Sequence, residues 1–298
     1  MKILITGISG MLGRALWKTL QGSNEIVGLD IRDTPLKFEK YITKPSLEKL
    51  NITNQEEISK IIDRRKPNIV IHTAAYTDVD GCEREPEKAN KVNALGTENV
   101  ARACKAGNCL LIYISTDFVF DGEKKSAYLE SDPPEPINVY GESKLAGEKL
   151  VQSLLKRHII IRSSWLFGKG GKNFVDTILE KAKTANELKV VDDQFGSPTY
   201  AGDLAQAIAD LIAMPDETEG IYHITNSGSC SWHQFARAIK ELAGLDAKVV
   251  AVSSAEYRSP AQRPAMSTLD NRRYQELSGG RNLRPWKEAL QEYLSGQN

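Results

Sequence analysis

A tyrosine and a lysine four residues apart offer the clearest chemistry in this chain. Tyr140 and Lys144 fall in a strongly helical segment, and residues at i and i+4 share one helix face. A free phenol titrates near ~10, so using it as a proton donor and acceptor near pH 7 requires stabilising the phenolate by about 3 pKa units, or about 4 kcal/mol. A neighbouring cation provides such stabilisation. The spacing therefore predicts an acid–base pair, although an isolated pair of this kind is more often an exposed surface feature.

A glycine-rich turn follows the first apolar segment of the chain. Residues 2–6 have the length of a strand, and Gly7-Ile-Ser-Gly10-Met-Leu-Gly13 follows at once. A tight turn, a close backbone approach and a helix packed on a strand each favour a residue without Cβ. The helix expected from Met11 to Leu20, whose first turn contains Met11 and Leu12, offers free N–H groups and a positive dipole end to a pyrophosphate. The pattern predicts a bound dinucleotide.

The choice between NADH and NADPH stays open in the sequence. A second strand, residues 25–29, ends at Asp30, whose carboxylate would accept hydrogen bonds from the adenine ribose hydroxyls. Arg32 lies two residues further on and would instead attract a 2′-phosphate. We therefore expect NADPH or NADH as the cofactor.

Three side chains together predict ketone reduction. Hydride transfer from a dihydronicotinamide to a ketone carbon builds an alkoxide, which must be stabilised and protonated. Tyr140 is expected to be the general acid, and Lys144 to lower its pKa and to hydrogen-bond the nicotinamide ribose. Thr116, at the end of an apolar segment, is expected to polarise the carbonyl oxygen.

Composition excludes several other classes of protein. The chain has 298 residues, 41% of them hydrophobic, with 39 basic and 39 acidic side chains, so no global field attracts nucleic acid or a membrane surface. No apolar segment approaches the ~20 residues that span a bilayer, and the first strand leaves no room for a signal peptide. The four cysteines and four histidines show no metal-ligand spacing. We expect a cytoplasmic protein with reduced cysteines and no bound metal.

Alternating strands and helices predict the fold class. Strands are expected at residues 2–6, 25–29, 68–72, 109–114 and 158–162, and helices at 11–20, 55–66, 85–106 and 138–155. This alternation predicts βαβ units and a parallel sheet, with ligands at the carboxyl ends of its strands. We expect an α/β protein: a Rossmann-like doubly wound parallel sheet formed by residues 1–162, with 189–214 packing back on it. Residues 163–188 and 215–298 are expected to form a smaller C-terminal substrate-binding lobe.

Taken together, the glycine turn, Thr116 and the Tyr140–Lys144 pair resemble the extended short-chain dehydrogenase/reductase family. Finer motifs, in the family's order along nearly the whole chain, are similar to the branch that reduces a keto sugar carried on dTDP. They are STDFVFDG at 115–122, NVYGESKLAGE at 138–148, RSSWLFG at 162–168, DQFGSPT at 193–199 and RPAMSTL at 263–269. The resemblance implies an NAD(P)H-dependent sugar-nucleotide ketoreductase acting on a dTDP-sugar.

The resemblance also assigns further site residues. It implies that Asp117 hydrogen-bonds the sugar and that Trp165 packs in the sugar-nucleotide pocket. The segment Ala75, Tyr76 and Thr77 matches the loop that lines the cofactor. Arg263 is a candidate for the substrate pyrophosphate, since a guanidinium matches phosphate geometry bidentately, and a surface salt bridge is nearly as consistent with its position.

Two positions depart from the family pattern. Asn51, before Ile52 in the cofactor-binding segment, stands where relatives usually carry an aspartate that bonds the adenine amine. Its side-chain carbonyl can still accept that bond. Ala15 stands where some relatives place a carboxylate ligand for Mg²⁺ at a dimer interface, which argues against that metal and leaves a homodimer open.

Two alternative functions remain open at this stage. The same scaffold hosts sugar-nucleotide epimerases and dehydratases, but a dehydratase needs a second acid beside the Thr-Asp pair, and Phe118 follows Asp117 here. A non-catalytic subunit, like the regulatory beta subunit of methionine adenosyltransferase, has no chemical need for Thr116, Tyr140 and Lys144 together. The identity of the sugar rests on resemblance alone.

Overall fold

A seven-stranded parallel sheet forms the centre of the computed structural model, which describes residues 1–32, 46–214 and 219–296. Its strand order is β11-β6-β5-β4-β1-β2-β3. The strands are β1 (Lys2–Thr6), β2 (Glu25–Asp30), β3 (Ser46–Lys49), β4 (Ile69–His72), β5 (Leu110–Thr116), β6 (His158–Ser163) and β11 (Gly220–His223). The order reverses between β1 and β4, and such a switch point opens a ligand crevice at the carboxyl ends of the strands. The predicted fold class is confirmed.

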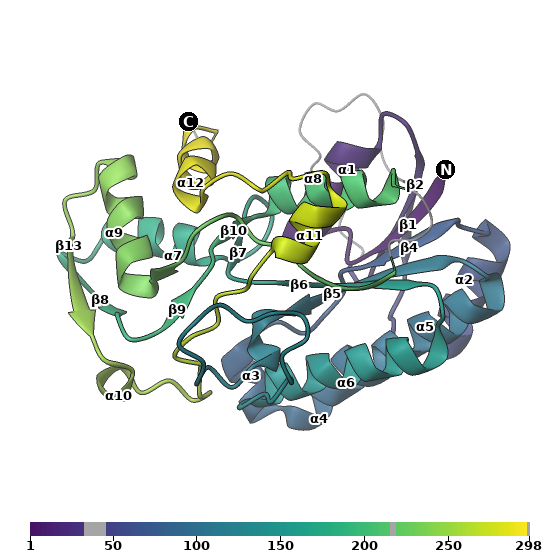
Figure 1. Ribbon diagram of the computed structural model, residues 1–298, viewed down its shortest axis with the longest axis horizontal. Coiled ribbons are helices and arrows are strands. Elements are labelled where there is room, and N and C mark those ends of the chain that lie inside the picture. The colour runs from purple at the N-terminus through teal and green to yellow at the C-terminus, as the bar shows by residue number, and fades with distance from the viewer. Residues whose placement is uncertain (33–45, 215–218, 297–298) are drawn as a thin grey trace.

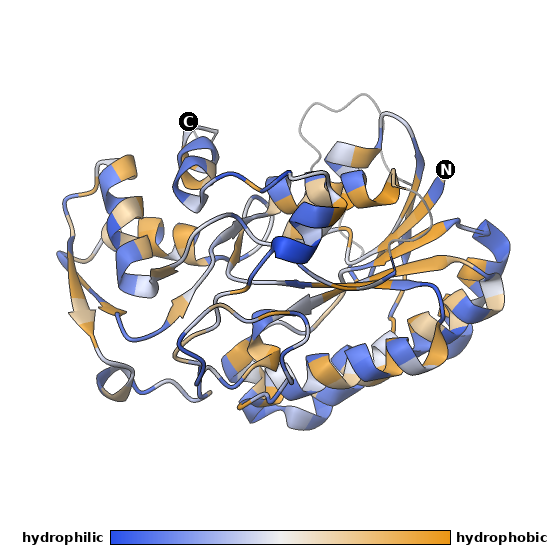
Figure 2. Ribbon diagram, viewed as in Figure 1, coloured by the Kyte–Doolittle hydropathy of each residue, from blue (hydrophilic) through white to orange (hydrophobic). Residues whose placement is uncertain are grey.

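Helices cover both faces of this sheet (Figure 1). One face carries α1 (Met11–Leu20), α8 (Ala201–Ile212) and α11 (Arg272–Leu277), and the other carries α2 (Gln55–Arg65), α5 (Gly96–Gly107) and α6 (Val139–Leu154). Side chains alternate along β1, where Ile3 and Ile5 belong to the first core and Leu4 to the second. Figure 2 shows largely apolar strands in this sheet, as expected when both faces are buried.

The helix predicted at residues 85–106 is interrupted in the structure. After α3 (Val79–Arg84) come α4 (Pro86–Ala89), a π-helical segment η1 (Asn90–Leu95) and then α5. Single π-turns inside helices occur frequently at functional sites. The apolar spacing of this segment is that of an ordinary helix, so the π-turn could not be predicted from it.

The smaller lobe has its own aromatic core. It contains α7 (Phe174–Ala182), α9 (Trp232–Ala243) and α12 (Trp286–Ser295) beside a parallel pair of strands, β8 (Glu187–Val191) and β13 (Lys248–Val252). Phe167, Phe235 and Trp286 are buried at its centre. Two further short strand pairs form separate sheets: β7 (Leu166–Phe167) with β10 (Thr199–Tyr200), and β9 (Phe195–Gly196) with β12 (Cys230–Ser231).

The structure divides the chain differently from the predicted boundaries at two places. Strand β11, within the segment assigned to the smaller lobe, pairs with β6 in the main sheet. Strand β8, whose last three residues were expected to pack back on the sheet, pairs with β13 in the lobe. Helix α8 does pack against α1 and the main core. Strand β3 was not among the strands expected from the sequence, and Pro35 and Pro45 lie outside the described residues.

Packing of α8 on the sheet yields a stability prediction. Leu204 is fully buried against the α1 side of the core, so Leu204→Ala should lower the free energy of unfolding by about 2–5 kcal/mol. The exposed Gln206 on the same helix provides the control, and Gln206→Ala should change it by no more than about 0.5 kcal/mol. Urea denaturation measures both, and equal effects would contradict the packing of α8 described above.

Candidate active site

The glycine turn places the start of α1 at the switch point of the sheet. Gly7 has φ 69°, and a Cβ there would lie 2.8 Å from the backbone nitrogen of Ala74 at the end of β4. Helix α1 begins at Met11 after Gly10, which has no side chain to cap the first turn. The free N–H groups of that turn therefore suit an anionic ligand. The Ser9 hydroxyl, also in the turn, is buried with no hydrogen-bond partner among the described residues.

Asp30 and Arg32 meet at the end of β2. Asp30 is 6% exposed and accepts hydrogen bonds from the backbone N–H of Ser9 and of Arg32, both at 3.0 Å. The Arg32 side chain also pairs with it, with 3.2 Å between Nε and Oδ1. Burial acts to raise the pKa of Asp30, but these hydrogen bonds hold it below its ordinary value. The position thus combines an ionised acceptor with a half-exposed cation.

The side chain of Asn51 is occupied in a way that the sequence did not indicate. Its carbonyl oxygen accepts from the backbone N–H of Thr53 at 3.1 Å and from the Thr53 hydroxyl at 3.0 Å. Ile52 is buried beside Gly96 of α5. An adenine amine bonded by Asn51 would have to share or replace the contact with Thr53.

Asn93 ties the predicted cofactor loop, Ala75-Tyr76-Thr77, to helix α6. Its side chain accepts from the Tyr76 N–H at 2.7 Å and donates to the Tyr76 carbonyl at 3.0 Å and the Ser143 hydroxyl at 3.0 Å. Asn93 is 1% exposed and lies in the π-helical segment. Sequence reasoning missed it, because a single asparagine within a helical pattern gives no functional signal.

Thr116 and Tyr140 come together at the carboxyl end of β5. Helix α6 begins after Asn138, whose side chain accepts from the Gly141 N–H at 2.8 Å. A Cβ on Gly141 would lie 2.1 Å from the Phe118 carbonyl oxygen, so only glycine allows α6 this close to the segment after Thr116. The Tyr140 ring packs edge-on against Phe118, with 5.8 Å between ring centroids.

Removal from water dominates the electrostatics of both Tyr140 and Lys144. It raises the pKa of Tyr140 above its ordinary value, although hydrogen bonding with Thr116 opposes the rise. Lys144 is 3% exposed, its Nζ donates to the Ile114 carbonyl at 2.7 Å, and it lies 4.2 Å from the centre of the Tyr113 ring. Burial lowers the pKa of Lys144 to about 7. The expectation that Lys144 lowers the pKa of Tyr140 is therefore contradicted, because burial raises that pKa.

Asp117 is held inside the site next to Thr116. The Thr116 hydroxyl donates to Asp117 Oδ1 at 3.0 Å and accepts from the Phe118 N–H at 3.2 Å. Asp117 is 1% exposed, and burial raises its pKa to about 6 against opposing hydrogen bonds that include those from Ser267 and Thr116. Its second oxygen has no partner among the described residues. Such an oxygen is suited to accept a hydrogen bond from a sugar hydroxyl.

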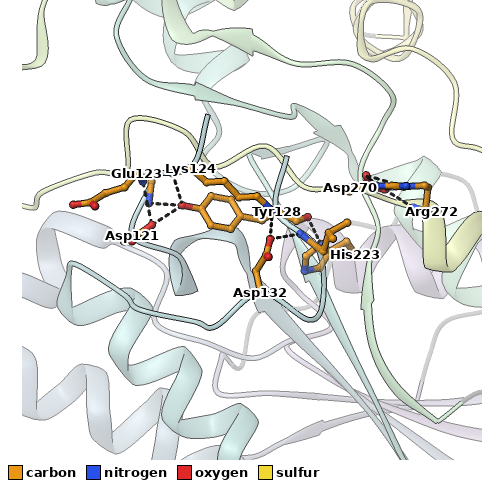
Figure 3. A network of polar contacts seen from close by, with 10 residues as sticks. Asp121, Glu123, Lys124, Tyr128, Asp132, His223, Asp270 and Arg272 are labelled. Atoms are coloured by element: carbon orange, nitrogen blue, oxygen red, sulfur yellow. Dashed lines mark hydrogen bonds and ion pairs between the residues drawn. The ribbon is translucent and has the colours of Figure 1, made fainter. Parts of the chain in front are cut away.

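The loop that follows Thr116 is fixed by a polar network (Figure 3). The Tyr128 hydroxyl donates to Asp121 and accepts from the backbone N–H groups of Gly122 and Lys124. The Nδ1–H of His223, in β11, donates to the Tyr128 carbonyl at 3.0 Å. Burial lowers the pKa of His223 to about 3, so this histidine stays neutral and has a structural role.

Trp165 and Arg263 lie near a cavity of about 490 Å³ between α3 and the smaller lobe. Trp165 has φ 45° and stacks on Trp232, one wall of the cavity, with 3.4 Å between ring centroids. Arg263 lines the cavity beside Asp80, and the two form an ion pair of 2.9 Å. The salt bridge considered for Arg263 is therefore present, and its binding of a substrate pyrophosphate stays a prediction. Thr116 and Tyr140 do not line this cavity.

Within residues 1–32, 46–214 and 219–296, no group of three histidine, cysteine or acidic side chains is arranged to hold a metal ion. All four cysteines are buried and unpaired. No helix in the described part of the chain is long and apolar enough to cross a membrane.

Comparison with known proteins assigns the site to a family. The RmlD substrate binding domain model matches residues 1–298. The dTDP-4-dehydrorhamnose reductase of Aggregatibacter actinomycetemcomitans is 40% identical over 97% of each chain. The chain belongs to the dTDP-4-dehydrorhamnose reductase family. As a member it is an NAD(P)H-dependent sugar-nucleotide ketoreductase, which confirms the predicted family, enzyme class and cofactor type.

Two further relatives extend this family assignment. The spore coat polysaccharide biosynthesis protein SpsK of Bacillus subtilis (strain 168) is 41% identical over 98% of this chain and 96% of its own. The crystal structure of dTDP-4-dehydrorhamnose reductase from Bacillus anthracis str. Ames, in complex with NADP, superimposes with a TM-score of 0.90. It is 38% identical and covers 99% of each chain. Family membership favours a reductase over the epimerase, dehydratase and regulatory-subunit alternatives.

The Asp30–Arg32 pair predicts dual use of the two cofactors. We expect dissociation constants for NADPH and NADH within about tenfold of each other, or ~1.4 kcal/mol. Asp30→Ala removes the charge that repels a 2′-phosphate and releases Arg32, so the preference should move toward NADPH. Fluorescence titration with each cofactor measures this, with Glu25→Ala at the exposed start of β2 as the control. A move toward NADH would show that Asp30 is not at the ribose.

Proposed function

We propose that this protein reduces the C4 ketone of dTDP-4-dehydro-L-rhamnose to dTDP-L-rhamnose with NADPH or NADH, and that Tyr140 is the general acid. The observation that carries the proposal is the hydrogen bond between Tyr140 and Thr116 at the carboxyl end of β5, where the close approach of Gly141 to Phe118 holds the start of α6. The names of the relatives supply the substrate.

The residues around the switch point fit a dinucleotide. The free N–H groups at Met11 and Leu12 would hold the pyrophosphate, and Asp30 with Arg32 would hold the adenine ribose. The loop from Ala75 to Thr77 would line the nicotinamide half, and the Lys144 amine would bond its ribose. The bound cofactor supplies the hydride in this reaction.

Tyr140 is suited to deliver the proton. Because burial raises its pKa, its hydroxyl is protonated at neutral pH and is available as a donor. As negative charge develops on the ketone oxygen, the Tyr140 hydroxyl gives up its proton to that oxygen, while the Thr116 hydroxyl hydrogen-bonds it. The charge then left on Tyr140 needs a nearby cation, and Lys144 lies one helical turn away on the same face.

The substrate has polar and aromatic partners available. The unpartnered oxygen of Asp117 would accept from a sugar hydroxyl, and the Trp165–Trp232 stack would border the nucleotide. Arg263 faces the cavity and would bind the pyrophosphate, with Asp80 orienting its guanidinium. Charge-assisted bonds of this kind are about twice as strong as neutral ones.

A direct assay tests the proposal together with the role of Tyr140. Purified protein mixed with dTDP-4-dehydro-L-rhamnose should oxidise NADPH and NADH, followed at 340 nm in a standard absorbance assay. Tyr140→Phe deletes one hydroxyl, so kcat should fall by roughly 10²–10⁴, the usual contribution of a positioned acid, with little change in cofactor affinity. Tyr222→Phe, on β11 beside Arg273, is the matched control and should retain activity.

Three results would oppose the proposal or one of its parts. Absence of cofactor oxidation with either nucleotide would exclude this substrate, and cofactor binding without turnover would favour a non-catalytic subunit. Near-normal turnover in Tyr140→Phe would remove Tyr140 from the role of acid while leaving the family assignment intact.

A further inference from the structure

A third residue lies on the same face of α6 as Tyr140 and Lys144. Glu148 follows Lys144 by four residues, as Lys144 follows Tyr140, and this spacing aligns the three side chains along the helix. Glu148 is 1% exposed, whereas Glu142 on the same helix is exposed. A carboxylate is rarely buried this deeply unless it is paired, and the proposed chemistry assigns Glu148 no role.

The partners of Glu148 come from the two strands beneath the helix. The Ser115 hydroxyl donates to Glu148 Oε1 at 2.5 Å, and Arg162 donates through Nε to Oε1 at 2.9 Å and through a terminal nitrogen to Oε2 at 2.7 Å. Arg162 is 2% exposed. Ser115 and Arg162 are register partners across β5 and β6, and Thr116 pairs with Ser163 at the next position. Glu148 therefore binds the sheet at Ser115 of β5, one residue before Thr116.

We propose that Glu148 is a positioning residue for the reaction: it fixes α6 on the Ser115–Arg162 pair, so that Tyr140 meets Thr116, and it supplies the negative charge that faces Lys144. The inference rests on the proposed roles of Tyr140 and Lys144. It adds a residue that touches neither substrate nor cofactor and acts through the two that do.

The surroundings of Lys144 explain why this charge matters. From β5 the Tyr113 ring lies under the ammonium, and the Ile114 carbonyl accepts a hydrogen bond from it. From β4 comes His72, which burial keeps neutral with a pKa of about 3. On α6 itself Tyr140 is protonated, and Glu148, shared with Arg162 of β6, is the anion in the described part of the chain that raises the pKa of Lys144 against the effect of burial.

Removing the charge of Glu148 should shift the pH dependence of activity in a defined direction. Glu148 raises the pKa of Lys144, so removing its charge lowers that pKa and Lys144 loses its proton at a lower pH. Activity that needs the Lys144 cation then declines at lower pH in the variant than in the parent enzyme. A residue with a purely structural role would change the amplitude of the pH profile or the Tm without moving this alkaline limb.

The experiment compares two variants that separate charge from placement, in the full-length enzyme with NADPH and the ketosugar. Glu148→Gln keeps the shape and loses the charge. In this variant the decline of kcat on the alkaline side of the pH profile should occur about half a pH unit or more lower than in the parent enzyme. NADPH binding measured by fluorescence should weaken over the same pH range. Glu148→Asp keeps the charge and shortens the reach. It should leave the limb in place while kcat falls about tenfold or more through misplacement, with KM for the sugar nearly unchanged.

Controls make either outcome decisive. Glu142→Gln, an exposed position on the same helix, should match the parent enzyme in every readout. If Glu148→Gln does not fold because Arg162 is left unpaired, Glu148→Gln with Arg162→Met removes both charges and should move the limb in the same direction, by a smaller amount because the Arg162 cation is lost as well. An unshifted limb in the folded variant, single or double, overturns the proposal. Tyr140→Phe, assayed in parallel, shows separately whether the proposed function itself fails.

Discussion

The close approach of helix α6 to the carboxyl end of β5 is the constraint on which the site depends. At its start the helix comes so near to Phe118 that residue 141 has to be glycine. Two turns later the buried Glu148–Arg162 pair holds the helix on β5 and β6. Breaking a buried pair by removing one partner typically costs 3–5 kcal/mol, because the other charge is left without compensation. Contacts within the core thus fix the relative positions of Tyr140 and Thr116.

Burial also sets the protonation of the candidate site residues. Tyr140 is kept protonated, the pKa of Lys144 is lowered to about 7 and the pKa of Asp117 is raised to about 6. The pKa values of Lys144 and Asp117 therefore lie where a single added charge changes the protonation of the group near neutral pH, whereas Tyr140 stays protonated. A bound cofactor and sugar nucleotide both bring charge to this site, so its electrostatics are suited to respond to them.

Much of the fold could be predicted from the sequence, because long periodic segments and local turn chemistry carry strong signals. Strand β1, helix α1 and the helix with Tyr140 and Lys144 begin and end within about two residues of their predicted bounds. Strands β3 and β11 were missed, since both are four-residue edge strands whose place depends on distant partners. The role of Asn93 escaped for the same reason, because its partners Tyr76 and Ser143 lie far from it in the sequence.

The site could be predicted in its residue types but not in its energetics. Spacing alone placed Tyr140 and Lys144 on one helix face. The direction in which the pKa of Tyr140 is shifted, however, depends on how much water the fold excludes. The bond from Thr53 to Asn51 and the pairing of Arg263 with Asp80 join groups whose partners no motif named. Glu148 was part of a quoted motif, and only its burial reveals a use for it.

The most direct test of the account is a crystal structure of the protein with NADP⁺ and dTDP-L-rhamnose. We expect the hydroxyls of Tyr140 and Thr116 both to lie within about 3.2 Å of the sugar O4. The Lys144 amine should hydrogen-bond the nicotinamide ribose, and Glu148 should still be paired with Arg162. A complex in which O4 lies away from Tyr140, with another acid beside it, would contradict the account.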